Sequence, residues 1–331
     1  NLPAIDQNDE AMLNVYAVTR TATAAIPAGH EVAREQFGGS SKQFFTQNQT
    51  AQGKLEVSKV ANMINFKAGA VSGSFNSKTG KFVSYQIGDV SLITSFPEPY
   101  FWRAPTDNDR IAHFAEKWDG YGVRDLERID CTITETAKSY KVSSVWQTST
   151  GFKVKQVQLV TPIAGGYSVK ETITTPKQWD DIARVGINFE IDGALSNFTY
   201  LGVGPHETYP DRKIGRVGKW ASSVWEQYIP YVRPQENGGH TGVRWFTLTD
   251  NAGNGLRIDM DKPRQVSVNP FRATELADAT HDVELRASGN TVVHIDAAHR
   301  GVGTASCGPD TLPQYLVSGG TYSFTWSVRT I

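Results

Sequence analysis

Apolar and polar residues alternate with a period of two in many short segments of this 331-residue chain, and this pattern restricts its fold more than any other feature. Successive side chains of a β-strand point to opposite faces, so such alternation is typical of half-buried strands in antiparallel sheets. The clearest examples are residues 13–20, 55–60, 139–146 and 152–160. Further predicted strands are residues 167–174, 183–191, 243–249, 265–269, 291–296 and 321–328. The sequence therefore predicts an all-β, antiparallel fold, with turns at residues 77–80, 165–166, 288–290 and 318–320.

Helical patterns are few. Residues 110–119 and residues 272–281 are predicted to form short helices. A (β/α)8 barrel requires a helix after every strand. The chain cannot supply those helices, so we expect no catalytic barrel of the kind that many glycosidases use.

A change in composition divides the chain. Residues 38–54 are polar, rich in Gly, Ser and Gln, and without periodicity, which is typical of a linker. Residues 1–37 are too few for an independent domain and read as the last strands of a β-sandwich, whereas residues 55–331 can form one large β domain. The chain begins at Asn1 without an initiator Met or a signal peptide, so we interpret it as part of a longer protein.

Charge and cysteine content exclude several classes of function. Lys and Arg number 33 against 34 Asp and Glu, and this balance argues against a nucleic-acid partner. No run of 18 apolar residues occurs, so no membrane-spanning helix is predicted. Cys131 and Cys307 form neither a disulfide framework nor a zinc site. They leave the compartment open between cytoplasm and periplasm.

Four segments are polar, aromatic and rich in turn residues, which makes them candidates for chemistry: residues 97–110, 201–212, 228–240 and 299–315. In the first, the oxygens of Asp107, Asn108 and Asp109 could bind Ca²⁺. The Gly and the later Glu of an EF-hand loop are missing. An Asx-rich turn with Arg103 paired to a carboxylate is therefore the favoured interpretation.

Two glutamates are candidates for a glycosidase pair, because glycosidases use two carboxylic residues. Glu207 and Glu236 lie in separate Gly- and Pro-rich segments, and sequence spacing cannot show that they face each other. Structural ion pairs with the neighbouring Arg212 and Arg233 are the favoured alternative.

Histidine and cysteine give weaker signals. The histidines His206, His240, His281 and His299 are scattered and form no metal-binding motif. Ordinary surface or hydrogen-bonded imidazoles are the favoured interpretation. The functional alternative is an acid–base couple of His206 or His240 with a glutamate. A nucleophilic role for Cys307 is not favoured, because its Gly-rich surroundings are equally explained by close approach to another surface.

Five ordered blocks of sequence resemble the C-terminal region of glycoside hydrolase family 2 β-galactosidases. They are Phe-Trp-Arg-Ala-Pro-Thr-Asp-Asn-Asp at 101–109, Gly-Val-Gly-Pro-His-Glu-Thr-Tyr-Pro-Asp-Arg at 202–212, Tyr-Ile-Pro-Tyr-Val-Arg-Pro-Gln-Glu-Asn-Gly at 228–238, Asn-Pro-Phe at 269–271 with Glu275, Leu276 and His281 following, and Gly-Val-Gly-Thr-Ala-Ser-Cys-Gly-Pro at 301–309. Together they resemble the family's "β-galactosidase small chain" domain over residues 55–331. Residues 1–37 resemble the end of the Ig-like domain that precedes it.

The resemblance implies a large antiparallel supersandwich like that of galactose mutarotases. It also implies a non-catalytic module, inactive by itself, of a retaining enzyme that hydrolyses terminal β-D-galactosides. The catalytic glutamates would lie on an upstream barrel, which would be the partner of this chain. The full-length enzyme is expected to be a homo-oligomer. The resemblance implies no cofactor in this fragment, and any Mg²⁺ or Na⁺ of the full-length enzyme would find its ligands upstream.

The resemblance also implies residues that contact the galactoside. A loop of this module would close one side of the substrate pocket, and Cys307, flanked by Ser306 and Gly308, stands where some members carry a Trp. Cysteine removes that aromatic platform. The remaining blocks are expected to line a polar groove on the concave face, through Arg103, Asp107, Glu207, Tyr209, Arg212, Glu236, Asn237 and His240. A stand-alone carbohydrate-binding module and a mutarotase-like enzyme remain the two alternatives.

Overall fold

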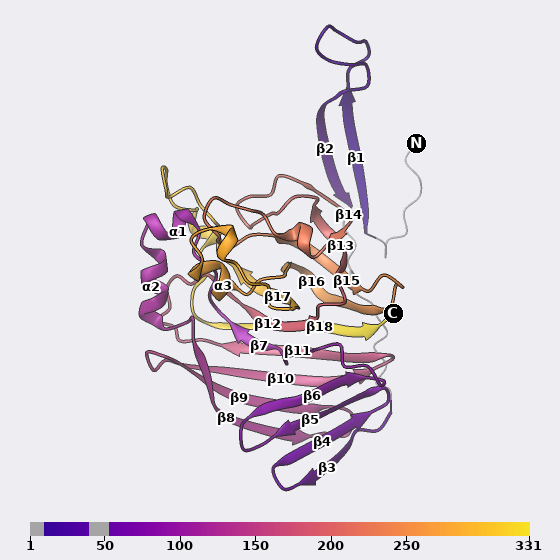
Figure 1. Cartoon of the computed structure of the whole chain (residues 1–331), viewed down its shortest axis with the longest axis vertical. Helices are drawn as coiled ribbons and strands as arrows, with labels where there is room; N and C mark the ends of the chain where they lie inside the picture. The colour runs from indigo at the N-terminus through magenta and orange to yellow at the C-terminus, as the bar shows by residue number, and fades with distance from the viewer. Residues whose placement is uncertain (1–9, 40–52) are drawn as a thin grey trace. The chain divides into compact units, whose positions relative to one another are not determined.

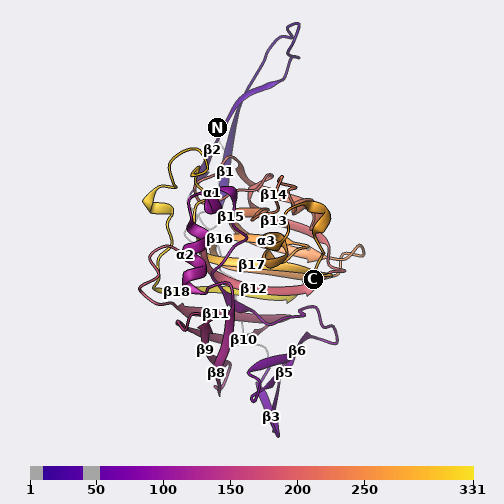
Figure 2. The ribbon, with the colours of Figure 1, turned by 60° about the vertical axis from the view of Figure 1, so that its left-hand side comes forward.

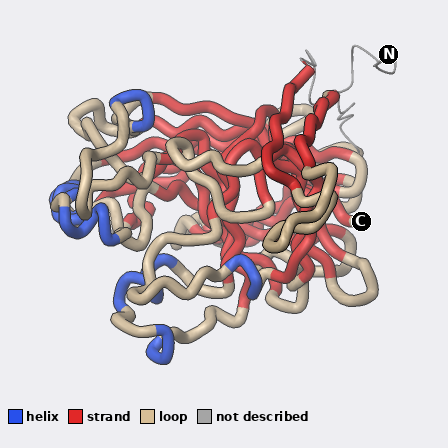
Figure 3. The backbone as a smooth tube through the Cα atoms, turned by 90° about the horizontal axis from the view of Figure 1, so that it is seen from above, coloured by secondary structure: helices blue, strands red, loops and turns tan. Residues whose placement is uncertain are grey.

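The strands form three antiparallel sheets, and the largest contains twelve strands (Figure 1). The computed structural model describes residues 10–39 and 53–331. The two-stranded sheet contains β1 (Ala11–Val18) and β2 (Glu31–Gly39), and the four-stranded sheet contains β3 (Glu56–Val60), β4 (Met63–Ala68), β5 (Val71–Asn76) and β6 (Lys81–Ile87). The twelve-stranded sheet contains β7 (Glu98–Tyr100), β8 (Leu126–Glu135), β9 (Tyr140–Thr148), β10 (Lys153–Ile163), β11 (Gly166–Thr174), β12 (Arg184–Asp192), β13 (Asn197–Gly204), β14 (Arg216–Ser223), β15 (Gly239–Thr249), β16 (Gly255–Asn269), β17 (Asn290–His299) and β18 (Thr321–Thr330). The helices are α1 (Asp107–Ile111), α2 (Phe114–Tyr121) and α3 (Ala273–Asp278), which lie outside the body of strands (Figure 3).

The chain divides into two compact units, Asn1–Gln47 and Asn48–Ile331. The described part of the first unit is the β1–β2 hairpin. The second unit holds the other two sheets and all of the features discussed below. Most of the predicted linker at 38–54 lies outside the described residues, so the predicted domain boundaries and the Ig-like identity of residues 1–37 stay predictions.

The twelve-stranded sheet branches at β16, which explains how one sheet can make two layers. The first part of β16, from Leu256 to Met260, pairs with β18, whereas the last part, from Gln265 to Asn269, pairs with β17. One branch continues from β18 through β11, β10 and β9 to β8, and the other from β17 through β12 to β7. Side chains on the facing surfaces of the two branches can therefore pack against each other.

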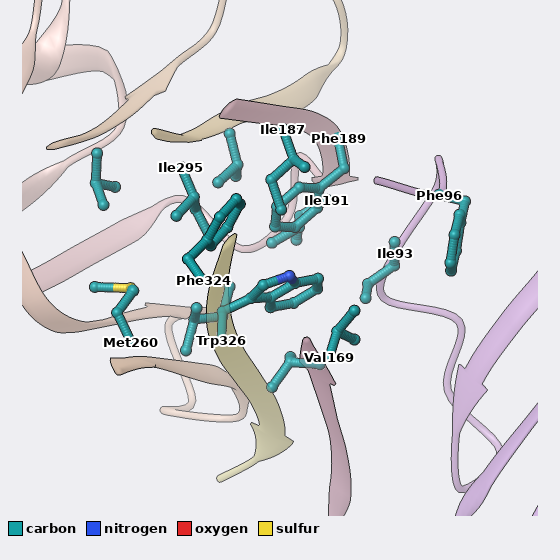
Figure 4. Packing of buried hydrophobic residues seen from close by; sticks show 14 of the residues in the cluster. Ile93, Phe96, Val169, Ile187, Phe189, Ile191, Met260, Ile295, Phe324 and Trp326 are labelled. Atoms are coloured by element: carbon teal, nitrogen blue, oxygen red, sulfur yellow. The ribbon is translucent and has the colours of Figure 1, made fainter. Parts of the chain in front are cut away.

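Aromatic and branched aliphatic side chains fill the space between the two branches (Figure 4). Trp326 of β18 stacks on Phe189 of β12, with ring centroids 5.4 Å apart. Ile187, Ile295 and Val169 surround this pair and are buried. Burial of large apolar side chains is the main stabilising contribution to such a core.

The four-stranded sheet packs its aromatic face against strands β9 and β11; Figure 2 shows it beside β8–β10. The ring centroids of Phe66 in β4 and Tyr140 are 4.7 Å apart, and those of Tyr85 in β6 and Tyr167 are 4.8 Å apart. The hydroxyls of Tyr85 and Tyr140 are hydrogen-bonded at 2.5 Å. This bond satisfies two polar groups that the aromatic cluster buries.

Glu171 of β11 is a carboxyl group in the core face of the sheet, between the branches. Its oxygens accept hydrogen bonds from three neutral donors, Gln158 Nε2 at 2.9 Å, Gln156 Nε2 at 3.2 Å and Trp326 Nε1 at 3.3 Å. Burial penalises the charged form more strongly than these donors favour it, and it raises the pKa of Glu171 to about 7.

Replacing Glu171 by glutamine is expected to reduce the dependence of stability on pH by about 2–3 kcal/mol between about pH 5 and pH 8. The folded chain holds the Glu171 proton with a pKa of about 7 against 4.5 ordinarily. The stabilisation from this group is therefore complete below pH 4.5 and is lost as the pH rises through 7. The free energy of unfolding of both proteins at the two pH values measures it, with the exposed Glu135 changed to Gln as the control. An unchanged pH dependence in the Glu171→Gln variant would refute a protonated Glu171.

The alternation pattern located ten of the strands, and the all-β antiparallel prediction is confirmed. The predicted strand at 265–269 is only the end of β16, which begins at Gly255. The strands without a prediction are β2, β4, β5, β6, β7, β8, β13 and β14. In β5 and β13 glycine takes some of the buried alternate positions, Gly73 in β5 and Gly202 and Gly204 in β13, which weakens the pattern.

The helix predicted at 110–119 is wrong in its bounds. Two helices occupy this region, α1 and α2, and His113 separates them with a left-handed backbone, φ 62°. The Thr106 side chain accepts from the Asp109 amide at 3.2 Å and fixes the start of α1. The predicted helix at 272–281 is shorter, at Ala273–Asp278. No helix in the described ranges is long and apolar enough to cross a membrane.

Candidate functional site

The four polar segments singled out in the sequence meet at one place in the second unit. The Glu236 amide donates to the Ala104 carbonyl at 2.9 Å, which joins segment 228–240 to segment 97–110. The Gly238 amide donates to Glu207 Oε2 at 2.8 Å, which joins it to segment 201–212. Segment 299–315 is joined to the first segment through Asn108, described below. The four segments are therefore neighbours in the fold.

Arg103 is the buried centre of the first segment. Its guanidinium donates to both carboxylate oxygens of Asp109, at 2.9 and 2.7 Å, and to the carbonyls of Arg300 and Gly301, at 3.0 and 3.2 Å. Both side chains of the ion pair are fully buried. The predicted pairing of Arg103 with a carboxylate is confirmed, and the pair fixes the base of the loop that follows residue 300.

Two further side chains hold that loop from opposite sides. Asn108 Nδ2 donates to the carbonyls of Val302 and Gly303, at 2.9 and 2.8 Å. Asp211 accepts from the amides of the same two residues, at 2.9 and 2.8 Å, and from Thr311 Oγ1 at 2.8 Å. These bonds fix both arms of the loop, residues 302–303 and Thr311. The tip between the two arms therefore has a rigid base.

The tip of the loop, residues 304–309, is a turn that faces solvent. Its ends are close, because Thr304 Oγ1 donates to the Pro309 carbonyl at 2.8 Å and the Gly308 amide donates to the Thr304 carbonyl at 2.7 Å. Ser306, Cys307 and Gly308 are all exposed. The Ser306 amide donates to Asn108 Oδ1 at 2.9 Å, so even the tip is oriented by α1.

Both carboxylate oxygens of Glu207 are hydrogen-bonded to neighbouring groups. Oε1 accepts from Arg212 and from the Tyr231 hydroxyl, and Oε2 accepts from the Gly238 amide. The predicted Glu207–Arg212 ion pair is confirmed. Asp107 is exposed and bonds to Gln235, whose Nε2 donates to its Oδ2 at 3.2 Å.

Glu236 belongs to a buried group of charges. Its Oε1 accepts a hydrogen bond from Arg184 Nη2 at 2.5 Å. The predicted pairing of Glu236 with Arg233 is therefore wrong. The backbone at residue 236 turns the side chain inward toward β12, whereas Arg233 is exposed. Arg184 also donates to His299 Nε2 at 2.9 Å, while His299 Nδ1 donates to the Arg300 carbonyl at 2.7 Å. His299 is therefore neutral, and burial together with Arg184 lowers its pKa to about 4.

The two carboxylates beside Arg184 respond to it in opposite ways. Burial acts against ionisation of Glu236, but Arg184 overcomes it and holds the pKa of Glu236 well below its usual range. Asp296 lies farther from the guanidinium, with Oδ2 3.8 Å from Arg184 Nε. Burial dominates there, reinforced by Glu236, and raises the pKa of Asp296 to about 7.

The remaining residues of the predicted polar, hydrogen-bonded groove are mostly buried. Tyr209 and Asn237 have exposed fractions of 1% and 3%. His240, at 1%, is hydrogen-bonded to the Tyr200 hydroxyl and to Gln227, and burial lowers its pKa to about 4. His206 is exposed, and both oxygens of the neighbouring Glu207 are occupied. Hydrogen bonds hold Asn237 and His240 in the interior.

Comparison with known proteins identifies the family of this chain. The family described as "Beta galactosidase small chain" matches residues 67–328. The chain belongs to this family. Similar proteins include the β-galactosidases of Priestia megaterium, 29% identical over 98% of this chain and 32% of its own length, and of Arthrobacter, 29% identical over 93% and 32%. The β-galactosidase BgaC of Bifidobacterium adolescentis is 30% identical over 69% of this chain and 23% of its own length. This small-chain sequence thus spans about a third of the length of the relatives it matches.

Solved structures similar to the small-chain domain include a galactose mutarotase-like protein from Clostridium acetobutylicum. The TM-score is 0.46 at 8% identity, and the match covers 84% of this chain and 98% of that one. A 4-α-glucanotransferase from Thermococcus litoralis gives a TM-score of 0.41 at 9% identity. This match covers 85% of this chain and 40% of that one.

The small-chain domain offers no evident metal ligands. Within residues 10–39 and 53–331, no three His, Cys, Asp or Glu side chains are grouped to hold an ion. Asp107 and Asp109, the candidates for Ca²⁺, point to different partners, Gln235 and Arg103.

Sequence reasoning missed three polar side chains of the strands: Arg184 of β12, Gln265 of β16 and Asp296 of β17. All three are at least nine-tenths buried. Within an alternating strand a polar residue is expected to face solvent, so the pattern assigns these residues to the wrong face. The only available signal was an Arg immediately before an apolar run, at 184–187.

Proposed function

We propose that this chain is the C-terminal, non-catalytic module of a retaining β-galactosidase that hydrolyses terminal β-D-galactosides. Its membership of the small-chain family carries the proposal, together with β-galactosidase relatives about three times as long. The catalytic glutamates would lie on an upstream barrel of the same enzyme. That barrel is the proposed partner, in an enzyme that assembles as a homo-oligomer.

The state of the two candidate carboxylates supports a non-catalytic role. A retaining glycosidase needs a nucleophile and a general acid about 5–5.5 Å apart, with the acid protonated near neutral pH. Glu236 is buried, and Arg184 holds its pKa below the usual range, so it cannot serve as that acid. Glu207 gives both oxygens to three neighbours. Neither carboxylate is free to reach a glycosidic oxygen.

The loop at residues 301–311 is the element that we propose closes one side of the galactoside pocket. Arg103, Asn108 and Asp211 hold its base, and the exposed tip carries Ser306, Cys307 and Gly308. A rigid loop positions contact groups without paying for their ordering on binding. Cys307 offers the sugar a small thiol, so aglycone stacking at this point would be weaker than with an indole.

The purified chain is expected to leave a chromogenic β-galactoside intact, and a mixture with the separately expressed upstream part is expected to hydrolyse it. The reason is that the acid and the nucleophile would come from one part and the closing loop from the other. Release of the chromophore measures both. Activity of the chain alone that survives repurification would refute the proposal and make Glu207 and Glu236 the next residues to replace.

The same mixture tests the loop. Replacing residues 304–309 by two glycines keeps the base intact, because the bonds of Asn108 and Asp211 to residues 302, 303 and 311 lie outside the replaced segment. The matched control shortens the exposed turn at 250–254, which is closed by a 2.9 Å bond from the Asp250 amide to the Asn254 carbonyl. Only the replacement of residues 304–309 should reduce kcat/KM. Sedimentation should show that both shortened variants assemble with the upstream part equally well. Loss of assembly instead would contradict the pocket-closing role.

A further inference from the structure

A cavity of 330 Å³ is lined by residues of β15, β16 and β17 and by residues 314–317. Gln265 and Asp296 are cross-strand partners on its floor, and His299 lies beside them. Tyr315 and Lys213 stand at its rim, with the Lys213 ammonium 5.6 Å from the Tyr315 ring. Its volume is at the lower end of the range for ligand pockets, about 300–1,000 Å³.

The floor of the cavity carries buried acceptors without a partner. Gln265 Nε2 donates to the Thr208 carbonyl at 3.1 Å, which fixes the amide and leaves Oε1 unbonded. Asp296 Oδ1 is unbonded as well. The exposed fractions of the two side chains are 9% and 2%. Unpaired buried polar atoms are costly and rare in folded proteins, so two together on a cavity floor indicate a ligand.

Donors without a partner lie near these acceptors, on Arg184 and Tyr209, which do not themselves line the cavity. Arg184, fully buried, uses Nη2 for Glu236 and His299, while Nε and Nη1 have no hydrogen bond. Its Nε lies 3.8 Å from Asp296 Oδ2. The Tyr209 hydroxyl is likewise buried and unbonded. The site thus combines unmet donors with unmet acceptors, and its buried charges are of both signs.

This combination selects the class of ligand. An anion would meet the carboxyl group of Asp296 on the floor, and a cation would meet Lys213 and Arg264 in the lining. A hydroxyl group both donates and accepts, so a neutral polyol satisfies both kinds of atom without adding charge. The Tyr315 ring at the rim supplies an apolar face of the kind that packs on a sugar ring.

We propose that this cavity binds a neutral monosaccharide, whose hydroxyls bond to Gln265 and Asp296 on the floor while the ring lies near Tyr315. The site goes beyond the proposed function, since it needs neither the upstream part nor the loop tip at 304–309. It would give the module an affinity for sugar of its own.

Calorimetric titration of the full 331-residue chain with D-galactose and with D-glucose tests the proposal, and sodium sulfate serves as the anion probe. Saturable binding of at least one sugar and none of sulfate is expected. Gln265→Leu should weaken that binding by about tenfold or more, because the substitution leaves a sugar hydroxyl unpaired. Gln227→Leu is the matched control, as Gln227 is also a buried amide but is bonded to Ser222 and His240 outside the cavity.

A rim variant keeps the test valid if Gln265→Leu does not fold. Tyr315→Ala removes the ring but leaves the backbone bonds of residue 315 to Gly301 and Leu312. It should also weaken binding. Absence of saturable sugar binding, preference for sulfate, or equal affinity in the wild type and both cavity variants would each overturn the proposal. None of these results depends on galactosidase activity, so the complementation experiment stands or fails separately.

Discussion

Replacing Arg103 by methionine is expected to lower the free energy of unfolding of the large unit by about 3–5 kcal/mol. The substitution leaves the Asp109 carboxylate fully buried without its counter-charge, and it removes donors to the carbonyls of Arg300 and Gly301. Removing one member of a buried pair is much more costly than the pair itself is stabilising, because the remaining charge cannot reach water. The midpoint of urea unfolding, at unchanged slope, measures the loss.

Lys117→Met is the matched control for this variant. Lys117 pairs with Asp180 at 2.8 Å, but the two side chains are 36% and 70% exposed. Exposed pairs contribute about 0–1 kcal/mol, because solvent screens them. Equal losses in the two variants would contradict the buried-pair argument. Arg103→Lys should fall between them, since an ammonium keeps the charge but cannot bond to both oxygens of Asp109.

The sequence was sufficient for much of the architecture because period-two alternation is a local property of one strand. It was also sufficient for the pairing of Arg103 with a carboxylate, because the partner, Asp109, is only six residues away. The convergence of the four polar segments was expected from the family resemblance alone, because the bonds between Asn108 and Gly303 and between Glu207 and Gly238 span long stretches of chain.

The buried charges could not be predicted, because they depend on which strands become neighbours. Arg184 and Asp296 belong to β12 and β17, which are adjacent only through pairing across more than a hundred residues. The branching of β16 brings Gln265 opposite Asp296 and is invisible in an alternation that runs along a single strand. Glu236 was placed correctly in a polar segment, but its partner was sought nearby in sequence, at Arg233, instead of across the fold at Arg184.

Replacing Arg184 by methionine is expected to cost about 3–5 kcal/mol of stability at pH 8, and at least about 1 kcal/mol less at pH 5. Arg184 is the buried cation that faces Glu236 and Asp296, and it lowers the pKa of both. In the wild type Glu236 is ionised at both pH values, in the folded and the unfolded chain, so it adds no pH dependence in this range. Without the guanidinium, burial raises its pKa above the unfolded value, and the pKa of Asp296 rises further.

The sign of the pH effect follows from these raised pKa values. A folded carboxyl with a raised pKa stabilises the fold at low pH and loses that stabilisation as the pH increases through it, so the Arg184→Met variant should be least stable at pH 8. His294 and His299 act in the same direction, because Arg184 lowers their pKa values and its removal eases their protonation at pH 5. Urea unfolding of wild type and variant at the two pH values measures the difference. Adding Glu236→Gln to the variant should recover part of the loss at pH 8 and little at pH 5, whereas a cost independent of pH and of Glu236 would show that packing, and not charge, is the role of Arg184.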